Sequence, residues 1–392
     1  MSDPSHDPPA AALPSGGGQT RPATLTPLDV ARERLLAGLA PAPEQDAPLE
    51  TALGCVAAFH PPLPAALPKS AVATRDGWAF RAADLAGASA YAPVLVDSGP
   101  VWVEPGQKLP EGADCVIDPA GVEAAGPLVQ VLIEAFPGEN IRRAGEDLSA
   151  DWPSGLNGRV ITAFDVMAAR VSGLTGLRIR QPRVTILDAP ARDGAQTTSR
   201  LIASLAQAMG AAVDTRTAAG RDRAAVREAL ERGNAELVLL IGGTGCGRED
   251  ESIAALAQCD NGLIHGLALQ PGRTSAVARI DGCPVIALPG SPDQALAVWW
   301  ALCEPVLARL GGRRAQAPCS LPLRHKISSA IGLAEIVLLL HDGETFTPVA
   351  TGDLPLQKLL AATHFFIIGA DSEGHAPGEI VRAQAIQTSL PT

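Results

Sequence analysis

Aromatic residues are scarce in this sequence. Its 392 residues include five Trp, one Tyr and seven Phe, whereas 46% of the residues are hydrophobic. So much apolar material excludes a wholly disordered chain, and its core must consist mainly of Ala, Leu, Val and Ile. The shortage of rings also argues against a protein that binds nucleic acids by stacking bases on aromatic side chains.

An excess of positive charge is also missing. The chain has 31 basic and 42 acidic residues, which gives a formal net charge of -11. This balance disfavours a general polyanion-binding surface, so we expect no nucleic-acid partner. A local basic pocket for a small phosphorylated ligand remains compatible with it.

Cysteine pairs and long apolar runs are lacking too. The seven cysteines are odd in number and form no CxxC pair, which disfavours a disulfide framework or a zinc site. No run of about 20 apolar residues predicts a membrane span. The start, Met1–Pro4, lacks the features of a secretory signal. We therefore expect a cytoplasmic protein without a membrane partner, with roughly two or three domains for this length.

The N-terminal part of the chain divides into a tail and a linker domain. Pro, Gly, Ser and Thr dominate residues 1–26, which predicts a flexible tail. Segments 27–60 and 139–182 combine polar turns with helical spacing and predict one N-terminal linker domain. Helices are expected in this domain from Pro27 to about Leu39 with Thr26 as N-cap, over Pro48–Phe59, and over Ala163–Gly173 after the Thr162 cap.

Two further segments have the character of small β domains. Short β runs and turns fill 61–138, and four prolines in its first eight residues oppose a helix there. Residues 313–392 also contain short β runs broken by Gly and Pro, which predicts a C-terminal β domain.

The segment 183–312 alternates strands with helices. Its apolar runs are VTILDA, AAVDTRTA, ELVLLIGG, SAVARI and CPVIALPG, and its helical stretches are Thr198–Met209, Arg223–Arg232, Glu251–Gln258 and a long apolar helix to Leu310. Such alternation predicts a parallel sheet with helices on both faces. Ligands of such sheets bind beyond the carboxyl ends of the strands.

A glycine-rich loop follows one of these strands. The sequence GGTGCGRED covers 242–250, directly after ELVLLI. Its glycines and Thr244 can turn successive N–H groups toward an anion. Asp250 opens the next helix and could act as N-cap, metal ligand or proton acceptor. The loop has neither the GK[ST] of a P-loop nor a clean GxGxxG.

Two more turns are candidates for the same site. Pro289-Gly290-Ser291-Pro292 forms a rigid turn after a strand, with Ser291 placed to cap the next helix. Arg273 lies in a third turn, where it could contact phosphate or face solvent.

In chain order, these motifs resemble the molybdopterin molybdenumtransferase family, which includes MoeA and the E domain of gephyrin. The resemblance extends over about 26–390 and rests on six segments: ATRDGWA at 73–79, PEGADCV at 110–116, GENIRRAGED at 138–147, the glycine loop, QPGRT at 270–274 and LPGSP at 288–292.

The resemblance implies an α/β multidomain fold. A MoeA-like linker domain, a small β module, a MogA-like parallel α/β domain at 183–312 and a small, barrel-like C-terminal β domain would follow one another. It also implies a homodimer, with the site between the α/β domain of one chain and the β module of the other.

The family's reaction defines the expected ligands. It inserts molybdenum from molybdate into the dithiolene of adenylated molybdopterin and releases AMP, with a divalent cation such as Mg²⁺. A recipient molybdoenzyme or another cofactor-biosynthesis protein is a further candidate partner. The catalytic residues carried over are Asp76, Asp222 and Asp250, of which Asp76 and Asp250 would hold the metal. The ligand-binding residues carried over are Gly242, Gly243, Thr244, Gly245, Gly247, Arg273, Pro289, Gly290, Ser291 and Pro292.

Several family residues are changed. The family's functional glutamate falls on Arg192, a threonine on Pro105, a serine on Gly245, and two lysines on Gln270 and Arg273. An arginine in place of a carboxylate reverses the local charge and should repel a divalent metal. Asp188 or Asp193 could replace the glutamate.

Three functions therefore stay open. The first alternative is an active, divergent molybdenumtransferase. The second is a catalytically impaired protein that binds molybdopterin or its nucleotide form as a carrier or maturation scaffold. An unrelated α/β enzyme that uses the glycine loop for a nucleotide is the third alternative.

Overall fold

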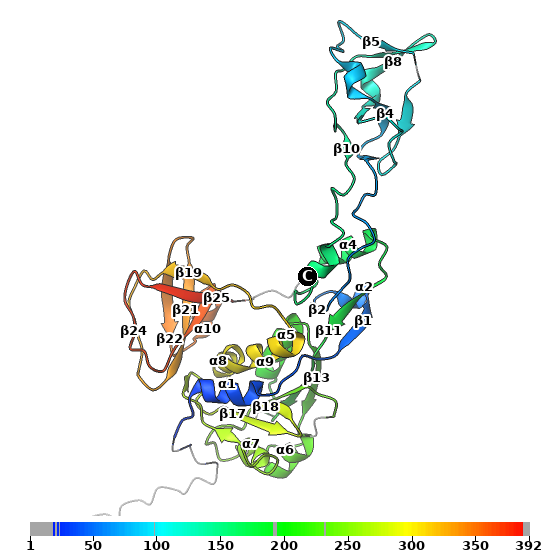
Figure 1. The fold of residues 1–392 in the computed structure, drawn as a ribbon. Coiled ribbons are helices and arrows are strands. Elements are labelled where there is room, and N and C mark those ends of the chain that lie inside the picture. Colours follow the sequence, from blue (N-terminus) through cyan, green and yellow to red (C-terminus); the bar gives the residue numbers. More distant parts are fainter. Residues whose placement is uncertain are drawn as a thin grey trace, which may run out of the picture.

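The computed structural model describes Gln19, Pro22 and residues 24–97, 99–190, 194–230 and 233–386. An α/β unit carries a β domain on one side and a narrow extension on the other, which ends in a small β module (Figure 1). Most of the predicted tail, and also Arg192 and Asp193, lie outside the described residues.

The α/β unit is built on a six-stranded sheet with the order β13-β12-β14-β18-β17-β15. Its four parallel strands are β13 (Ala212–Thr217), β12 (Arg183–Asp188), β14 (Leu237–Ile241) and β18 (Cys283–Leu288). The other two, β17 (Ala276–Ile280) and β15 (Ile264–His265), are antiparallel to their neighbours.

The prediction of a parallel sheet is therefore right for four strands and wrong for β17, and the short strand β15 was not among the predicted strands. Only Asp281 and Gly282 separate β17 from β18, and both have positive φ, at 47° and 79°. A two-residue turn of this kind joins antiparallel strands, whereas parallel strands need a long crossover.

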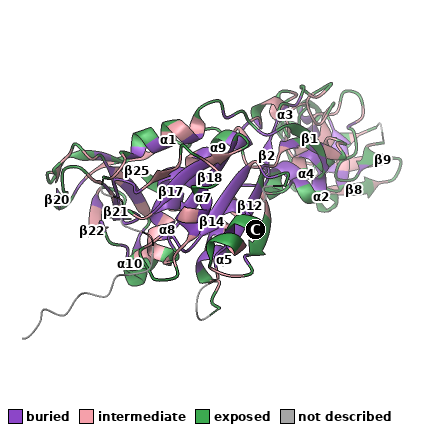
Figure 2. Cartoon of the chain, turned by 90° about the horizontal axis from the view of Figure 1, so that it is seen from below, coloured by how far each residue is buried: buried purple, intermediate pink, exposed green. Residues whose placement is uncertain are grey.

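Helices cover both faces of this sheet, as predicted. One face packs against α1 (Leu28–Leu36), α5 (Thr197–Ala208) and the helical run formed by α8 (Pro292–Val298), the π-helical turn η3 (Trp299–Cys303) and α9 (Glu304–Gly311). The other face packs against α6 (Arg223–Ala229) and α7 (Ser252–Leu256). Successive residues of β14 alternate between the two cores, and the central strands are buried throughout (Figure 2).

The linker region has a three-stranded sheet with the order β1-β11-β2. It consists of β1 (Glu44–Pro48), β11 (Gly176–Arg180) and β2 (Val56–Ala57), together with α2 (Leu49–Ala52), α3 (Trp152–Gly155) and α4 (Ala163–Val171). Thr162 caps α4 in a capping box with Asp165, as its sequence position indicates.

Two helix predictions in the N-terminal part need correction. The helix expected over Pro48–Phe59 stops after α2, because Gly54 has a φ of 80° and the chain then enters β2. Thr26 does not cap α1, since its backbone N–H and C=O bond to Gly266 and Ala268 in a β-bridge. Pro27 instead occupies the N-cap position.

The small β module contains two three-stranded sheets. One has the order β6-β4-β7, and the other has the order β5-β9-β8. Their bounds are β4 Gly77–Phe80, β5 Val94–Val96, β6 Val101–Val103, β7 Cys115–Ile117, β8 Val122–Ala125 and β9 Leu128–Val131, with short 3-10 turns at Ala82–Leu85 and Pro119–Gly121. The paired strands β3 (Val72–Ala73) and β10 (Ile141–Arg142) connect the module to the linker region and hold it away from the α/β unit (Figure 1).

The C-terminal region is a β domain, as predicted. Its main sheet has the order β16-β21-β23-β25-β19, with β22 beside β21. The elements are β16 Leu269–Gln270, β19 Cys319–Pro322, β20 Ile327–Ser328, β21 Ala334–His341, β22 Phe346–Thr351, α10 Leu356–Ala361, β23 His364–Ile368, β24 Gly374–His375 and β25 Ile380–Ala385. Because β16 belongs to the preceding segment, its parallel pairing with β21 joins this domain to the α/β unit.

Trp300 also joins these two regions, and we predict that its loss destabilises the protein. The buried indole stacks on Phe365 of β23, with ring centroids 4.2 Å apart. Trp300→Ala should lower the free energy of unfolding by about 3–5 kcal/mol, because it removes this contact and leaves a cavity. Urea unfolding followed by circular dichroism measures the change. The control Tyr91→Ala removes a fully exposed ring, so an equal loss in both variants would contradict the prediction.

Candidate functional site

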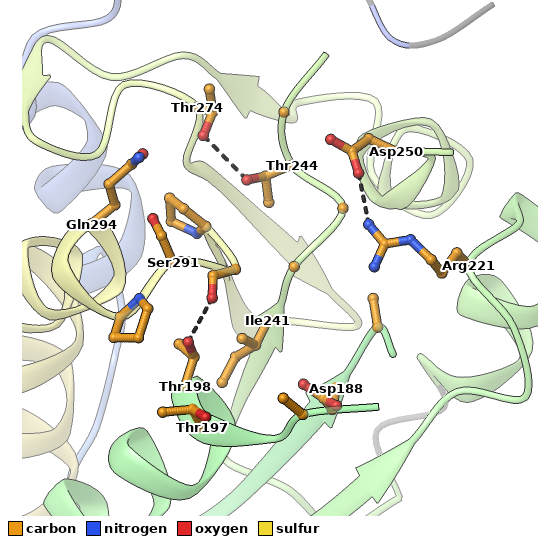
Figure 3. A pocket seen from close by; sticks show the side chains of 18 of the residues that line it. Asp188, Thr197, Thr198, Arg221, Ile241, Thr244, Asp250, Thr274, Ser291 and Gln294 are labelled. Carbon is orange, nitrogen blue, oxygen red and sulfur yellow. Dashed lines mark hydrogen bonds and ion pairs between the residues drawn. The ribbon is translucent and has the colours of Figure 1, made fainter. Parts of the chain in front are cut away.

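A pocket of about 640 Å³ opens at the carboxyl edge of the parallel strands. Asp188 ends β12, Ile241 ends β14, and Pro289 follows β18, so three neighbouring strands deliver residues to it. Figure 3 shows the side chains that surround it. The lining residues are Asp188, Ala189, Ala195, Thr197, Thr198, Arg221, Ile241, Gly242, Gly243, Thr244, Gly245, Cys246, Asp250, Thr274, Pro289, Gly290, Ser291, Pro292 and Gln294.

The glycine loop forms one wall, and its conformation requires glycine at two positions. Gly242 and Gly243 have φ values of 90° and 67°, and a Cβ atom on Gly243 would clash with Ser252 Oγ. The Ser252 hydroxyl donates a hydrogen bond of 2.8 Å to the Gly242 carbonyl. The start of α7 therefore holds the loop in its turned conformation.

Several backbone donors of this loop are free for a ligand. Within the described part of the chain, the N–H groups of Gly243, Thr244, Gly245 and Cys246 have no hydrogen-bond acceptor. Consecutive free N–H groups form an anion-binding surface. The N–H of Gly247, predicted to belong to it, instead donates to Asp250 Oδ2 at 3.0 Å.

Asp250 lies in the pocket wall, but its role differs from a helix cap. Helix α7 begins at Ser252, with Glu251 at its N-cap position. The Oδ1 atom of Asp250 accepts a hydrogen bond of 2.8 Å from Arg221 Nη2, and this ion pair is largely shielded from solvent (Figure 3). Arg221 Nη1 donates at 2.6 Å to the carbonyl of Pro190, just after β12.

Asp222 does not line the pocket, contrary to the sequence prediction. Its carboxylate accepts hydrogen bonds of 3.0 and 3.1 Å from the N–H groups of Ala224 and Ala225 and caps α6. The preceding residue, Arg221, faces the pocket instead. An aspartate in the connection before a helix serves as N-cap in many proteins, and this signal was available in the sequence.

Asp188 is a pocket residue, as one alternative suggested. Its side chain is only 5% exposed, and its Oδ2 atom has no hydrogen-bond partner in the described part of the chain. Burial raises the pKa of this carboxyl, while a hydrogen bond from Ser199 and the attraction of Arg221 act in the opposite direction.

Ser291 leaves a polar atom available for a ligand. It occupies the N-cap position of α8, but its hydroxyl makes no cap hydrogen bond. The buried Oγ has no partner among the described residues. Beside it, Thr198 Oγ1 donates to the Gly290 carbonyl at 2.5 Å and fixes the turn around Pro289 and Pro292.

The third predicted turn contributes a different residue from the one expected. Thr274 lines the pocket, and its hydroxyl lies 3.2 Å from that of Thr244. Arg273 is exposed and does not line the pocket. Gln270, at the position of a family lysine, donates instead to the Gly352 carbonyl in the C-terminal domain.

Asp76 lies far from the pocket of its own chain. It is exposed in the turn between β3 and β4 of the small β module, at the far end of the extension (Figure 1). Pro105 belongs to the same module, directly after β6.

A divalent cation does not fit the described residues. Magnesium requires oxygen ligands, usually carboxylates. Within one chain, the predicted ligands Asp76 and Asp250 lie in different regions and do not meet, and both oxygens of Asp250 accept hydrogen bonds from the protein. Among the described residues, no group of three or more His, Cys, Asp or Glu could hold a metal ion.

Gln19 is a site residue that the sequence did not suggest. Its Nε2 atom donates to the carbonyls of Gly243 and Gly245 at 2.9 and 3.1 Å, and its Oε1 atom accepts from the N–H groups of Ile253 and Ala254. The prediction of a flexible tail therefore does not hold for Gln19, which joins the glycine loop to the start of α7.

These features define a class of protein: a multidomain α/β protein with a polar, amide-lined pocket at the carboxyl edge of its parallel strands. Comparison with known families agrees with this class. Residues 26–173 match the family described as "MoeA N-terminal region (domain I and II)", and residues 185–309 match the "Probable molybdopterin binding domain".

Individual relatives have the same family character. The chain is 28% identical over 297 residues to molybdopterin molybdenumtransferase 2 of Mycobacterium tuberculosis, which covers 66% of this chain and 73% of that protein. It is 25% identical over 317 residues to the molybdopterin molybdenumtransferase of Haemophilus influenzae, covering 73% and 78%.

Among solved structures, the molybdopterin biosynthesis MoeA protein of Pyrococcus horikoshii has the same fold. It has a TM-score of 0.68 at 23% identity, with 93% of this chain and 100% of that chain covered. Taken together, these matches place the chain in the MoeA-like family. In the described residues, no helix is both long and apolar enough to cross a bilayer.

We predict that Asp188 destabilises the folded protein at neutral pH. Its raised pKa means that the folded state favours the protonated carboxyl, so ionisation opposes folding. Asp188→Asn should therefore raise the thermal unfolding midpoint at about pH 7.5. The gain should shrink as the pH falls through the folded-state pKa, because the wild-type carboxyl is then also neutral.

The matched control is Asp353→Asn, which removes an exposed carboxyl and should leave the midpoint unchanged at every pH. A destabilised Asp188→Asn variant at neutral pH would show that the Ser199 hydrogen bond and the attraction of Arg221 outweigh the cost of burying the ionised carboxyl, contrary to this account.

Proposed function

We propose that the chain acts in molybdenum cofactor biosynthesis by binding molybdopterin, or its adenylated form, in the pocket at the carboxyl edge of the α/β sheet. The bound dithiolene would receive molybdenum from molybdate, with release of AMP. The observation that carries this proposal is the row of free N–H groups from Gly243 to Cys246, within a fold of the MoeA-like family.

The pocket suits a phosphorylated pterin in size and chemistry. Its volume of about 640 Å³ lies within the range of small-molecule sites. The amide row can hold a phosphate group, and the Ser291 hydroxyl and Gln294 supply further polar contacts. Thr197 and Thr198 line the opposite wall.

The second candidate function is a carrier or maturation scaffold that binds the pterin without inserting metal. It is favoured by the ion pair between Arg221 and Asp250, because this carboxylate is then engaged by the protein itself. The distance of Asp76 from the pocket of its own chain favours it too, unless a second copy supplies this residue.

A homodimer would bring a second β module to the pocket, and an apolar surface on the linker region supports such an assembly. Phe164, Met167 and Val171 are 78%, 57% and 66% exposed. Their spacing of three and four residues places them on one face of α4. A groove beside them is lined by Leu49 and Leu53. Exposed apolar surface of this kind marks protein interfaces.

For the reaction itself, we predict stoichiometric AMP release in a single turnover with adenylated molybdopterin and molybdate, together with bound molybdenum.

Ser291→Ala should weaken pterin binding about tenfold, because it removes one hydrogen bond to the ligand. Its unfolding midpoint should stay at the wild-type value, since the hydroxyl has no partner in the described protein.

Gly155→Ala is the control for Ser291→Ala in both measurements, because a Cβ atom added at Gly155 meets nothing within 4 Å. Tight pterin binding without AMP release would select the scaffold function. Absence of pterin binding in the wild-type protein would contradict both candidates.

We predict that Met167→Lys produces monomers, because it places a charge in the middle of the apolar face of α4. Light scattering should give twice the chain mass for the wild-type protein and one chain mass for the variant. Leu360→Lys changes an exposed apolar residue on α10 and should stay dimeric. A monomeric wild-type protein, or a dimer broken only by Leu360→Lys, would rule out this interface.

A further inference from the structure

We infer that Arg221 takes the place of a divalent cation in this pocket, so that the protein binds its anionic ligand without a metal ion. This inference deepens the proposed function and rests on it for the identity of the ligand. It concerns the charge that neutralises Asp250, which lies at the edge of the glycine loop.

The guanidinium group brings to Asp250 the positive charge that a cation would otherwise supply. Arg221 donates to Asp250 Oδ1 at 2.8 Å and to the Pro190 carbonyl at 2.6 Å. It also attracts the buried carboxylate of Asp188. One positive charge therefore serves both acidic residues of the pocket, and Figure 3 shows it between them.

A metal ion would have to compete with this arginine for Asp250. The second oxygen of Asp250 accepts the N–H of Gly247 at 3.0 Å, so neither oxygen is left without a protein partner. A cation beside Asp250 would also lie next to the permanently charged guanidinium, which repels it. The pair thus opposes a metal chiefly through the charge of Arg221, and the two hydrogen bonds to Asp250 use part of the lone pairs that a metal would need.

Arginine can also contribute to ligand binding, which a merely structural ion pair would not do. Guanidinium groups present five N–H donors, and only two are used by Asp250 and Pro190. Each Nη nitrogen uses one of its two N–H groups in these contacts, which leaves the other N–H of each without an acceptor in the described part of the chain. Planar donors of this type bind phosphate oxygens well.

The sharpest test is to ask whether removal of the arginine creates a metal site. Mn²⁺ is titrated into the full-length protein at neutral pH and followed by electron paramagnetic resonance. Binding that disappears in Asp250→Asn reports on this pocket alone. The wild-type protein should show no such Asp250-dependent binding up to millimolar Mn²⁺, whereas Arg221→Asp should gain it.

The gain in Arg221→Asp should be lost in the double variant with Asp250→Asn. Arg221→Gln removes the charge but keeps a polar NH2 group and adds no carboxylate, so it should gain weaker Mn²⁺ binding than Arg221→Asp. If circular dichroism shows that Arg221→Asp does not fold, Arg221→Gln tests the inference in its place. Asp250-dependent Mn²⁺ binding by the wild-type protein, or no gain in a folded Arg221 variant, would overturn the inference.

This test is separate from that of the proposed function. A chain that binds the pterin and also shows an Asp250-dependent Mn²⁺ site would overturn the arginine inference alone. A chain that fails to bind the pterin would overturn the proposed function. The Mn²⁺ titration would still show whether Arg221 keeps a metal ion away from Asp250.

Discussion

The ion pair between Arg221 and Asp250 is the interaction on which the chemistry of the pocket depends. It joins the end of β12, the connection before α6 and the glycine loop into one wall. The ion pair neutralises the carboxylate at the edge of the loop. The free groups of the loop are then the N–H donors of Gly243 to Cys246, and the Ser291 hydroxyl lies nearby, while Asp188 Oδ2 is a free acceptor elsewhere in the pocket wall. Donors of this kind select an anion, which agrees with a phosphorylated pterin and with the family to which the chain belongs.

The second constraint is the length of the chain's extension. Two short paired strands hold the β module away from the α/β unit, so Asp76 and the pocket of the same chain are far apart (Figure 1). Any reaction that uses both therefore requires a second chain. The exposed apolar face of α4 offers a surface for this assembly, and the linker region connects it to the module. Catalysis and oligomerisation are thus linked in the proposed function.

The sequence predicted the order of the domains well, because apolar periodicity and turn residues act locally. The strands ending at Asp188, Ile241 and Leu288 and the two loops beyond them were all expected. The failures have long-range causes. The resemblance predicts Asp222 as a catalytic residue, but Asp222 caps α6, and its neighbour Arg221 lines the pocket instead. Gln19 bonds to a loop more than 220 residues away, which no local pattern reveals. The partner of Asp250 was hidden for the same reason.

A crystal structure of the protein with adenylated molybdopterin, grown in the presence of a chelator, would test the central claim most directly. The account predicts a ligand phosphate against the N–H groups of Gly243 to Cys246, with the ion pair between Arg221 and Asp250 intact beside it. A ligand bound elsewhere, or one that enters this pocket only when a divalent cation has displaced Arg221 from Asp250, would contradict it.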